Sequence, residues 1–137
     1  VATAGTTYAA IERITWLSLV MGCAAGALAC ALLVINNLRD IPTDREVGKR
    51  TLAVRLGDHR TRWFYVTLLG LSFAMAVVAA FDRTWTLVAL VSIPLAVAPS
   101  KRVLDGATGA ELIPVLGETG RLQLVFGALA TVGLVLG

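Results

Sequence analysis

Charged residues are scarce in this chain. They make up 15% of its 137 residues, whereas a soluble domain usually carries about 25%. Hydrophobic residues reach 57% and the mean hydropathy is +0.79. Intrinsic disorder is excluded, because disordered chains combine low hydrophobicity with high net charge. The composition therefore indicates an integral membrane protein.

Cysteine and histidine are almost absent as well. Cys23 and Cys30 are the only cysteines, and both lie inside one apolar run, which excludes a disulfide scaffold. His59 is the single histidine, so a histidine-based metal site is excluded within this chain. Glycine-rich nucleotide loops and catalytic triads are also missing, and the basic charge balance does not predict a nucleic-acid partner.

The chain begins at Val1 rather than at a methionine, inside an apolar stretch. The basic segment, apolar core and cleavage site of a signal peptide do not occur there in the required order. We expect the chain to be the C-terminal part of a larger polytopic protein, with N-terminal helices of the same protein missing.

Four apolar stretches predict membrane spans at about 14–38, 63–81, 84–100 and 120–137. Crossing a bilayer takes roughly 20 helical residues. The runs are continuous rather than alternating, which favours helices over a barrel. Pro94 and Pro99 predict a kink or an early exit in the third span. The predicted fold class is an all-α, polytopic transmembrane helix bundle, with 1–137 forming a single membrane-embedded unit.

The charges gather in the connections between these spans. Of the 21 charged residues (12 Lys and Arg plus 9 Asp and Glu), 11 fall between Arg39 and Arg62. Threading four spans puts the loops at about 39–62 and 101–119 on one side of the membrane. That side holds most of the basic residues, so the positive-inside rule predicts that both loops are cytoplasmic.

Two local patterns concern the first span, a pair of glycines inside it and a pair of charged residues before it. Gly22 and Gly26 stand four apart in the first span, a spacing that lets helix backbones approach closely, within the bundle or across a dimer. On the opposite side of the membrane, Glu12 and Arg13 are expected to form an interfacial pair.

The loop after the first span carries residues that suggest chemistry. Asp40 and Asp44 are four apart, which puts both carboxylates on one face of a helical turn. Paired carboxylates repel unless a cation lies between them, and an oxygen-only ligand set favours Mg²⁺, which takes one or two carboxylates plus substrate phosphates. Basic residues stand close by in the sequence, and two amides precede the pair: Arg39, Arg45, Lys49, Arg50, Asn36 and Asn37.

This arrangement predicts an acidic metal clamp inside a basic anion site, whose natural ligand is a diphosphate. The spacing of two aspartates alone is common by chance. A solvated cytoplasmic loop that merely obeys the positive-inside rule is therefore an equally good explanation of the charges.

The complete string is much more specific. It closely resembles the second aspartate-rich motif of the UbiA-type intramembrane prenyltransferases, through the pattern Asn-Asn-x-Arg-Asp-x-x-x-Asp-x-x-x-Gly-Lys-x-Thr-Leu-Ala-Val-Arg-Leu-Gly over residues 36–57. The stretch 112–122 is similar to the final loop of the same enzymes. Within that family, the motif is most similar to that of the members that use 1,4-dihydroxy-2-naphthoate.

The resemblance implies a fold of nine transmembrane helices, of which this chain would supply helices six to nine. The family's first motif, Asn-x-x-x-Asp-x-x-x-Asp, is absent, so we expect this chain alone to be inactive. The implied reaction moves a polyprenyl chain from an allylic diphosphate to 1,4-dihydroxy-2-naphthoate with decarboxylation, giving demethylmenaquinone at the inner (plasma) membrane.

The resemblance also implies roles for individual residues. Asp40 and Asp44 would bind Mg²⁺, supported by Asn36 and Asn37. Diphosphate contacts would come from Arg39 and Lys49 before Arg50 and Arg45. The segment 51–57 would cap the site, unless it is an exposed loop, and Glu118 and Arg121 would approach the site from the last loop.

Several alternatives stay open. Another UbiA-type enzyme would prenylate 4-hydroxybenzoate, a haem precursor or a chlorophyllide. An explanation from a different class is a non-catalytic segment of a membrane transporter, whose loop charges only orient it.

Overall fold

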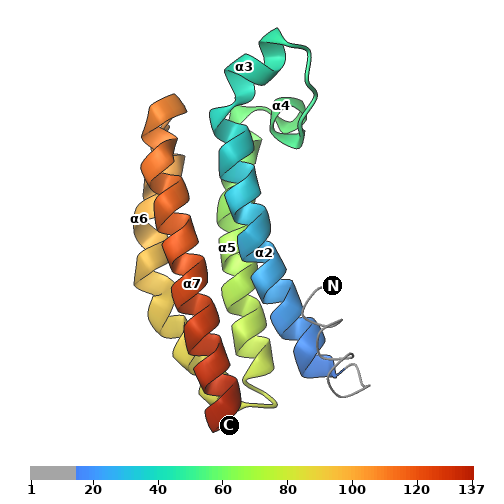
Figure 1. The fold of residues 1–137 in the computed structure, drawn as a ribbon, viewed down its shortest axis with the longest axis vertical. Helices are drawn as coiled ribbons and strands as arrows, with labels where there is room; N and C mark the ends of the chain where they lie inside the picture. Colours follow the sequence, from blue (N-terminus) through green and yellow to red (C-terminus); the bar gives the residue numbers. More distant parts are fainter. Residues whose placement is uncertain (1–14) are drawn as a thin grey trace.

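The structure, a computed structural model, describes residues 15–137 and is helical throughout, with no strand in that range (Figure 1). The elements are α2 (Trp16–Arg39), α3 (Ile41–Glu46), α4 (Leu52–Leu56), α5 (Asp58–Ala79), the 3-10 helix η1 (Thr84–Ser92), α6 (Ile93–Leu104), the 3-10 turn η2 (Gly109–Glu111) and α7 (Leu112–Leu136). The all-α prediction is confirmed. The pair expected at Glu12 and Arg13 lies outside the described residues.

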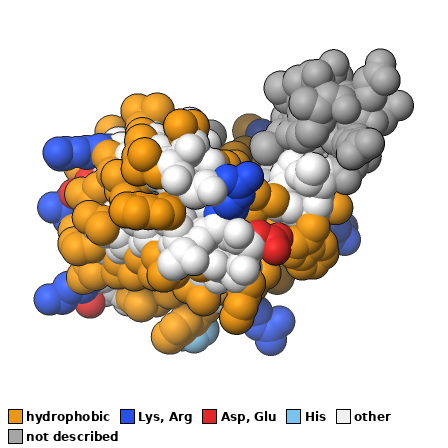
Figure 2. Space-filling view, turned by 90° about the horizontal axis from the view of Figure 1, so that it is seen from below, with side chains coloured by type: hydrophobic (Ala, Val, Ile, Leu, Met, Phe, Trp, Pro, Cys, Tyr) orange, Lys and Arg blue, Asp and Glu red, His pale blue; other side chains and the backbone are white. Residues whose placement is uncertain are grey.

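Four helical segments of the described chain are long and apolar enough to cross a membrane. They are Trp16–Arg39, Asp58–Ala79, Thr84–Leu104 and Gly109–Leu136, which confirms the prediction of a polytopic transmembrane bundle. Figure 1 shows that they run alternately up and down, so α3, α4 and the junction of α6 with α7 lie at the same end. Hydrophobic side chains cover most of the opposite end (Figure 2).

The core of the bundle forms where α2 packs along α5 and α7. Ala24, Leu28, Ala31 and Ile35 are completely buried at successive turns of α2, as the 3.6-residue period of a helix requires. Gly26 instead faces away from the other helices, with no atom within 4 Å of the place a Cβ would occupy. Among the described residues, alanines rather than Gly26 pack α2 against the other helices, so a close approach at Gly26 stays a prediction for a partner outside residues 15–137.

The helices extend further than the apolar runs that predicted them. α5 begins at Asp58 rather than at 63, and α7 begins at Leu112 rather than at 120. Gly57, with φ of +81°, ends α4 and lets α5 start at once. Asp58 lies in the first turn of α5, where a carboxylate is favoured by the helix dipole. The connections are therefore shorter than the predicted loops 39–62 and 101–119.

The third span contains both prolines without being interrupted. The chain changes from 3-10 to α geometry at Ile93, directly before Pro94, which lies in the first turn of α6. Proline fits there because the backbone N–H groups of a first turn have no partner within the helix, so the N–H that proline lacks is not needed. Pro99 lies inside the helix, which continues to Leu104. The helix thus changes its geometry at Pro94 and continues past Pro99, where a kink or an early exit was predicted.

Candidate functional site

The two aspartates lie where α2 gives way to α3. Asp40 ends α2, and its N–H donates to the carbonyl of Asn36 at 3.2 Å. The carbonyl of Asp40 in turn accepts from the N–H of Asp44 at 2.8 Å. Because this is the bond of an α-helical turn, the side chain of Asp44 follows that of Asp40 by one turn on the same face.

The two carboxylates have different surroundings. Asp40 accepts from Arg39 through both oxygens, with Nε–Oδ1 at 2.9 Å and Nη2–Oδ2 at 3.3 Å. This guanidinium lowers the pKa of Asp40, so the carboxylate stays ionised at neutral pH. Asp44 is only 8% exposed. Its nearest cation is Lys49, whose Nζ lies 3.9 Å from Oδ1.

A glycine turn brings Lys49 back toward Asp44. Gly48 has φ of +72°, a conformation that favours glycine, and the N–H of Lys49 donates to the carbonyl of Asp44 at 2.8 Å. Of the basic residues predicted to contact a diphosphate, Arg39 and Lys49 thus lie beside the carboxylates. Arg45 and Arg50 are exposed, and neither forms an ion pair within residues 15–137.

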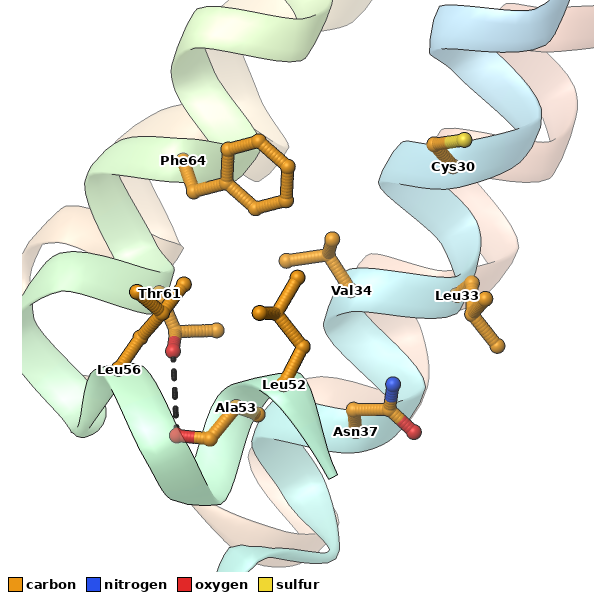
Figure 3. A pocket seen from close by; sticks show the side chains of 9 residues that line it. All are labelled: Cys30, Leu33, Val34, Asn37, Leu52, Ala53, Leu56, Thr61 and Phe64. Atoms are coloured by element: carbon orange, nitrogen blue, oxygen red, sulfur yellow. Dashed lines mark hydrogen bonds between the residues drawn. The ribbon is translucent and has the colours of Figure 1, made fainter. Parts of the chain in front are cut away.

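Asn36 and Asn37 are half-buried in the last turn of α2. Asn37 lines a pocket of about 170 Å³ that α2 forms with α4 and α5 (Figure 3). Leu52 and Leu56 of α4 also line it. The segment 51–57 is therefore a short helix packed against α2 and α5, beside the aspartate-bearing turn.

Two threonines fix this short helix. The hydroxyl of Thr51 accepts from the N–H of Val54 at 3.3 Å and caps the N-terminus of α4. At the other end, Thr61 Oγ1 donates to the carbonyls of Gly57 at 2.7 Å and Ala53 at 3.4 Å. Figure 3 draws the second of these bonds. The site end of α5 is thereby tied to α4.

Arg62 is an important residue that the sequence interpretation missed. Its guanidinium is buried and donates to Asp58 through Nε at 2.7 Å and Nη2 at 2.8 Å. Its Nη1 donates to the carbonyl of Val103, at 2.6 Å, and so joins α5 to the end of α6. The Asp58–Arg62 spacing of four was visible in the sequence and is the one signal that could have identified this pair.

This pair supports a prediction about stability. Asp58→Ala should lower the free energy of unfolding by about 2 to 4 kcal/mol, because it leaves a buried guanidinium without its counter-charge. Arg62→Met should cost less, since the remaining carboxylate is 57% exposed. Unfolding of both single variants and the double variant measures the coupling. Equal losses for the two single variants would contradict the argument.

Glu118 and Arg121, which were expected to approach the site from the last loop, both lie on α7. Glu118 lies on α7 and accepts from Arg102 of α6 at 2.8 Å, while its Oε2 is buried without a hydrogen-bond partner among residues 15–137. Arg121 is exposed on the same helix. The hydrogen bonds in the described part of the chain connect Glu118 to α6 and not to the turn of Asp40 and Asp44.

These features define a polytopic helical membrane protein with an acidic turn at the end of one span. The sequence comparisons make the class specific. The model of the UbiA prenyltransferase family matches residues 1–116. The chain belongs to the UbiA prenyltransferase family, as the motif over residues 36–57 predicted.

Curated relatives support the same assignment. The 1,4-dihydroxy-2-naphthoate octaprenyltransferase of Mycobacterium tuberculosis is 48% identical over 133 residues, which is 97% of this chain and 45% of that protein. The enzyme of that name from Escherichia coli is 37% identical, over 82% of this chain and 38% of its own. The UbiA prenyltransferase domain-containing protein 1 homolog of Drosophila melanogaster is 32% identical, over 74% and 28% respectively.

The chain thus spans less than half the length of these relatives. No solved structure gives a significant match to it.

Proposed function

We propose that this chain supplies the second aspartate motif of a prenyltransferase. The enzyme would move a polyprenyl group from an allylic diphosphate to 1,4-dihydroxy-2-naphthoate and form demethylmenaquinone. The observation that carries the proposal is the buried carboxylate of Asp44, one helical turn beyond Asp40 at the charged end of a membrane span. The names of the relatives support the choice of acceptor.

The donor set fits Mg²⁺. Asp40 and Asp44 offer the one or two carboxylates that this ion takes from protein, with phosphate oxygens and water completing its shell. The fork of Arg39 on Asp40 is compatible with this role, since a carboxylate has about four acceptor sites and the guanidinium uses two. When bound, the ion would supply charge to stabilise the diphosphate as it leaves.

The metal site needs further ligands from outside this turn. Residues 15–137 contain no group of three or more His, Cys, Asp and Glu residues that could hold a metal ion. The remaining ligands would come from the diphosphate and from the first aspartate motif, on N-terminal helices of the same protein. The exposed face of α2 around Gly26 offers a packing surface for such helices. This chain alone would then be inactive.

The other residues of the turn have roles that follow from their positions. Lys49, whose side chain is 66% exposed, would turn toward the diphosphate, while Arg39 would hold Asp40 ionised and contact the same group. Arg50 would contribute longer-range attraction. Asn36 and Asn37 would hold the metal shell or the diphosphate by hydrogen bonds.

In the reaction, the bond between the allylic carbon and the diphosphate oxygen breaks, and diphosphate leaves with the electron pair. The electron-rich ring forms the new carbon–carbon bond at the carbon that carries the carboxylate, and CO₂ leaves. The prenyl tail would lie in the bilayer among the helices. Because basic residues gather at the α3 and α4 end, that end would face the cytoplasm across the inner (plasma) membrane.

A prenyl-transfer assay on membranes containing the full-length protein tests this proposal. With Mg²⁺, a polyprenyl diphosphate and 1,4-dihydroxy-2-naphthoate, we expect product that disappears when EDTA is added and returns with excess Mg²⁺. Product with 4-hydroxybenzoate alone would keep the prenyltransferase class and overturn the acceptor. No product with either acceptor would overturn the proposed acceptor and favour a family member that uses a haem precursor or a chlorophyllide.

A further inference from the structure

A second hollow lies away from the aspartate turn, between α5 and α6. This groove holds about 530 Å³ and is lined mainly by apolar side chains of both helices. Val66 and Phe73 line it from α5, and Ile93 and Val97 line it from α6. No atom lies within 4 Å of the place a Cβ of Gly70 would occupy, so the α5 side of the groove stays open at that position.

Two opposite charges lie at one end of the groove. Lys101 and Asp105 both line it, and they stand four apart at the end of α6. No ion pair forms between them within residues 15–137. A basic residue placed four before an acidic one is the weaker order of such a pair. The neighbouring Arg102 pairs with Glu118 at 2.8 Å rather than with Asp105, so neither Lys101 nor Asp105 has an ion-pair partner within residues 15–137.

The length of the groove fits one half of a bilayer. From Lys101 to Ile93 the helix rises roughly 12 Å, at about 1.5 Å per residue. One leaflet contributes about half of the roughly 30 Å hydrocarbon core. A further transmembrane helix would need a matching surface over both leaflets, whereas this groove runs inward from its charged end over one.

We propose that this groove binds a phospholipid with a phosphoethanolamine headgroup. One acyl chain lies between α5 and α6, the phosphate pairs with Lys101, and the ammonium group pairs with Asp105. The proposal follows from charge complementarity at the mouth and from the apolar lining. It is independent of the prenyl-transfer function.

Native mass spectrometry of the full-length protein in detergent tests the binding. The protein is titrated with phosphatidylethanolamine and, separately, with phosphatidylglycerol of the same acyl chains. Lys101→Gln should weaken binding of both lipids about fivefold, since one basic residue near a lipid phosphate is worth about 1 kcal/mol. Asp105→Asn should weaken only phosphatidylethanolamine, because only that lipid carries an ammonium group.

A pair of matched valines tests the groove itself. Val97→Phe fills the groove and should remove lipid adducts, whereas Val91→Phe should leave them unchanged. Val91 is 70% exposed and does not line this groove. Arg60→Gln controls for charge, because Arg60 is exposed on α5 and does not line the groove either.

Three results would overturn the proposal. The first is a wild-type protein that retains no phosphatidylethanolamine, as expected if another segment of the full-length protein covers the groove. The second is an Asp105→Asn variant that binds each of the two lipids as tightly as the wild type does. The third is equal loss in the Val97 and Val91 variants. Prenyl-transfer activity, measured in parallel, is expected to persist in the Val91 and Arg60 controls.

Discussion

Asp44→Asn is expected to lower prenyl transfer by at least about 100-fold without harming the fold. Loss of metal stabilisation of the leaving group costs several kcal/mol, and each 1.4 kcal/mol or so slows the reaction about tenfold. Asparagine keeps the size of the side chain but not its charge. Rates measured in full-length protein at saturating Mg²⁺ give the effect, and Asp40→Asn should behave similarly.

The stability of Asp44→Asn, unlike its activity, should increase or stay unchanged. Asp44 is 8% exposed, and among the described residues its only ion pair is the 3.9 Å contact with Lys49. Removing its charge therefore breaks no close ion pair, and an amide costs less to bury than a carboxylate. The thermal unfolding temperature of Asp44→Asn should therefore equal or exceed that of the wild type. This separation of activity from stability is characteristic of a residue kept for function.

The matched control is Glu46→Gln. Glu46 also lies on α3 but is exposed and forms no ion pair within the described residues. The prenyl-transfer activity of Glu46→Gln should stay within about twofold of wild type, because an exposed charge is screened by water and salt. If both variants keep wild-type activity, the metal role of Asp44 is wrong. If both lose it equally, net charge at this end matters rather than one ligand.

Much of the fold followed from the sequence because membranes restrict the possibilities. A backbone in lipid must satisfy its own hydrogen bonds, so long apolar runs become helices. Hydropathy could not locate the ends, since helices continue into polar sequence when a cap or a turn allows it. Gly57 illustrates this, because its positive φ lets α5 begin among charged residues that hydropathy assigned to a loop.

The backbone geometry of the candidate site followed from the sequence, but its side-chain contacts did not. The spacing of Asp40 and Asp44 predicted a shared helical face, and the backbone bond between them agrees. Composition could not distinguish the paired carboxylate of Asp40 from the buried one of Asp44, because burial depends on how α3 folds back. Arg62 was missed for a related reason, since its partner Val103 lies on another helix.

Close backbone packing predicts a second effect on stability at Gly133, where α7 crosses η1. A Cβ at this position would lie 2.8 Å from the carbonyl carbon of Trp85 and 2.9 Å from the Cα of Thr86. These are backbone atoms, so a side chain cannot move aside to make room. Gly133→Ala should therefore lower the free energy of unfolding by about 1 to 3 kcal/mol, the usual cost of overpacking.

Gly127 provides a control on the same helix. No atom lies within 4 Å of the place its Cβ would occupy, so Gly127→Ala should stabilise the protein by about 0.5 to 1 kcal/mol through reduced backbone entropy. Unfolding in detergent, followed by tryptophan fluorescence, compares the two variants. Opposite signs would identify the contact of α7 with η1 as close backbone packing, since both substitutions change helix propensity equally. A gain in both variants would mean that α7 and η1 can separate without cost, and the close approach would then contribute nothing to stability.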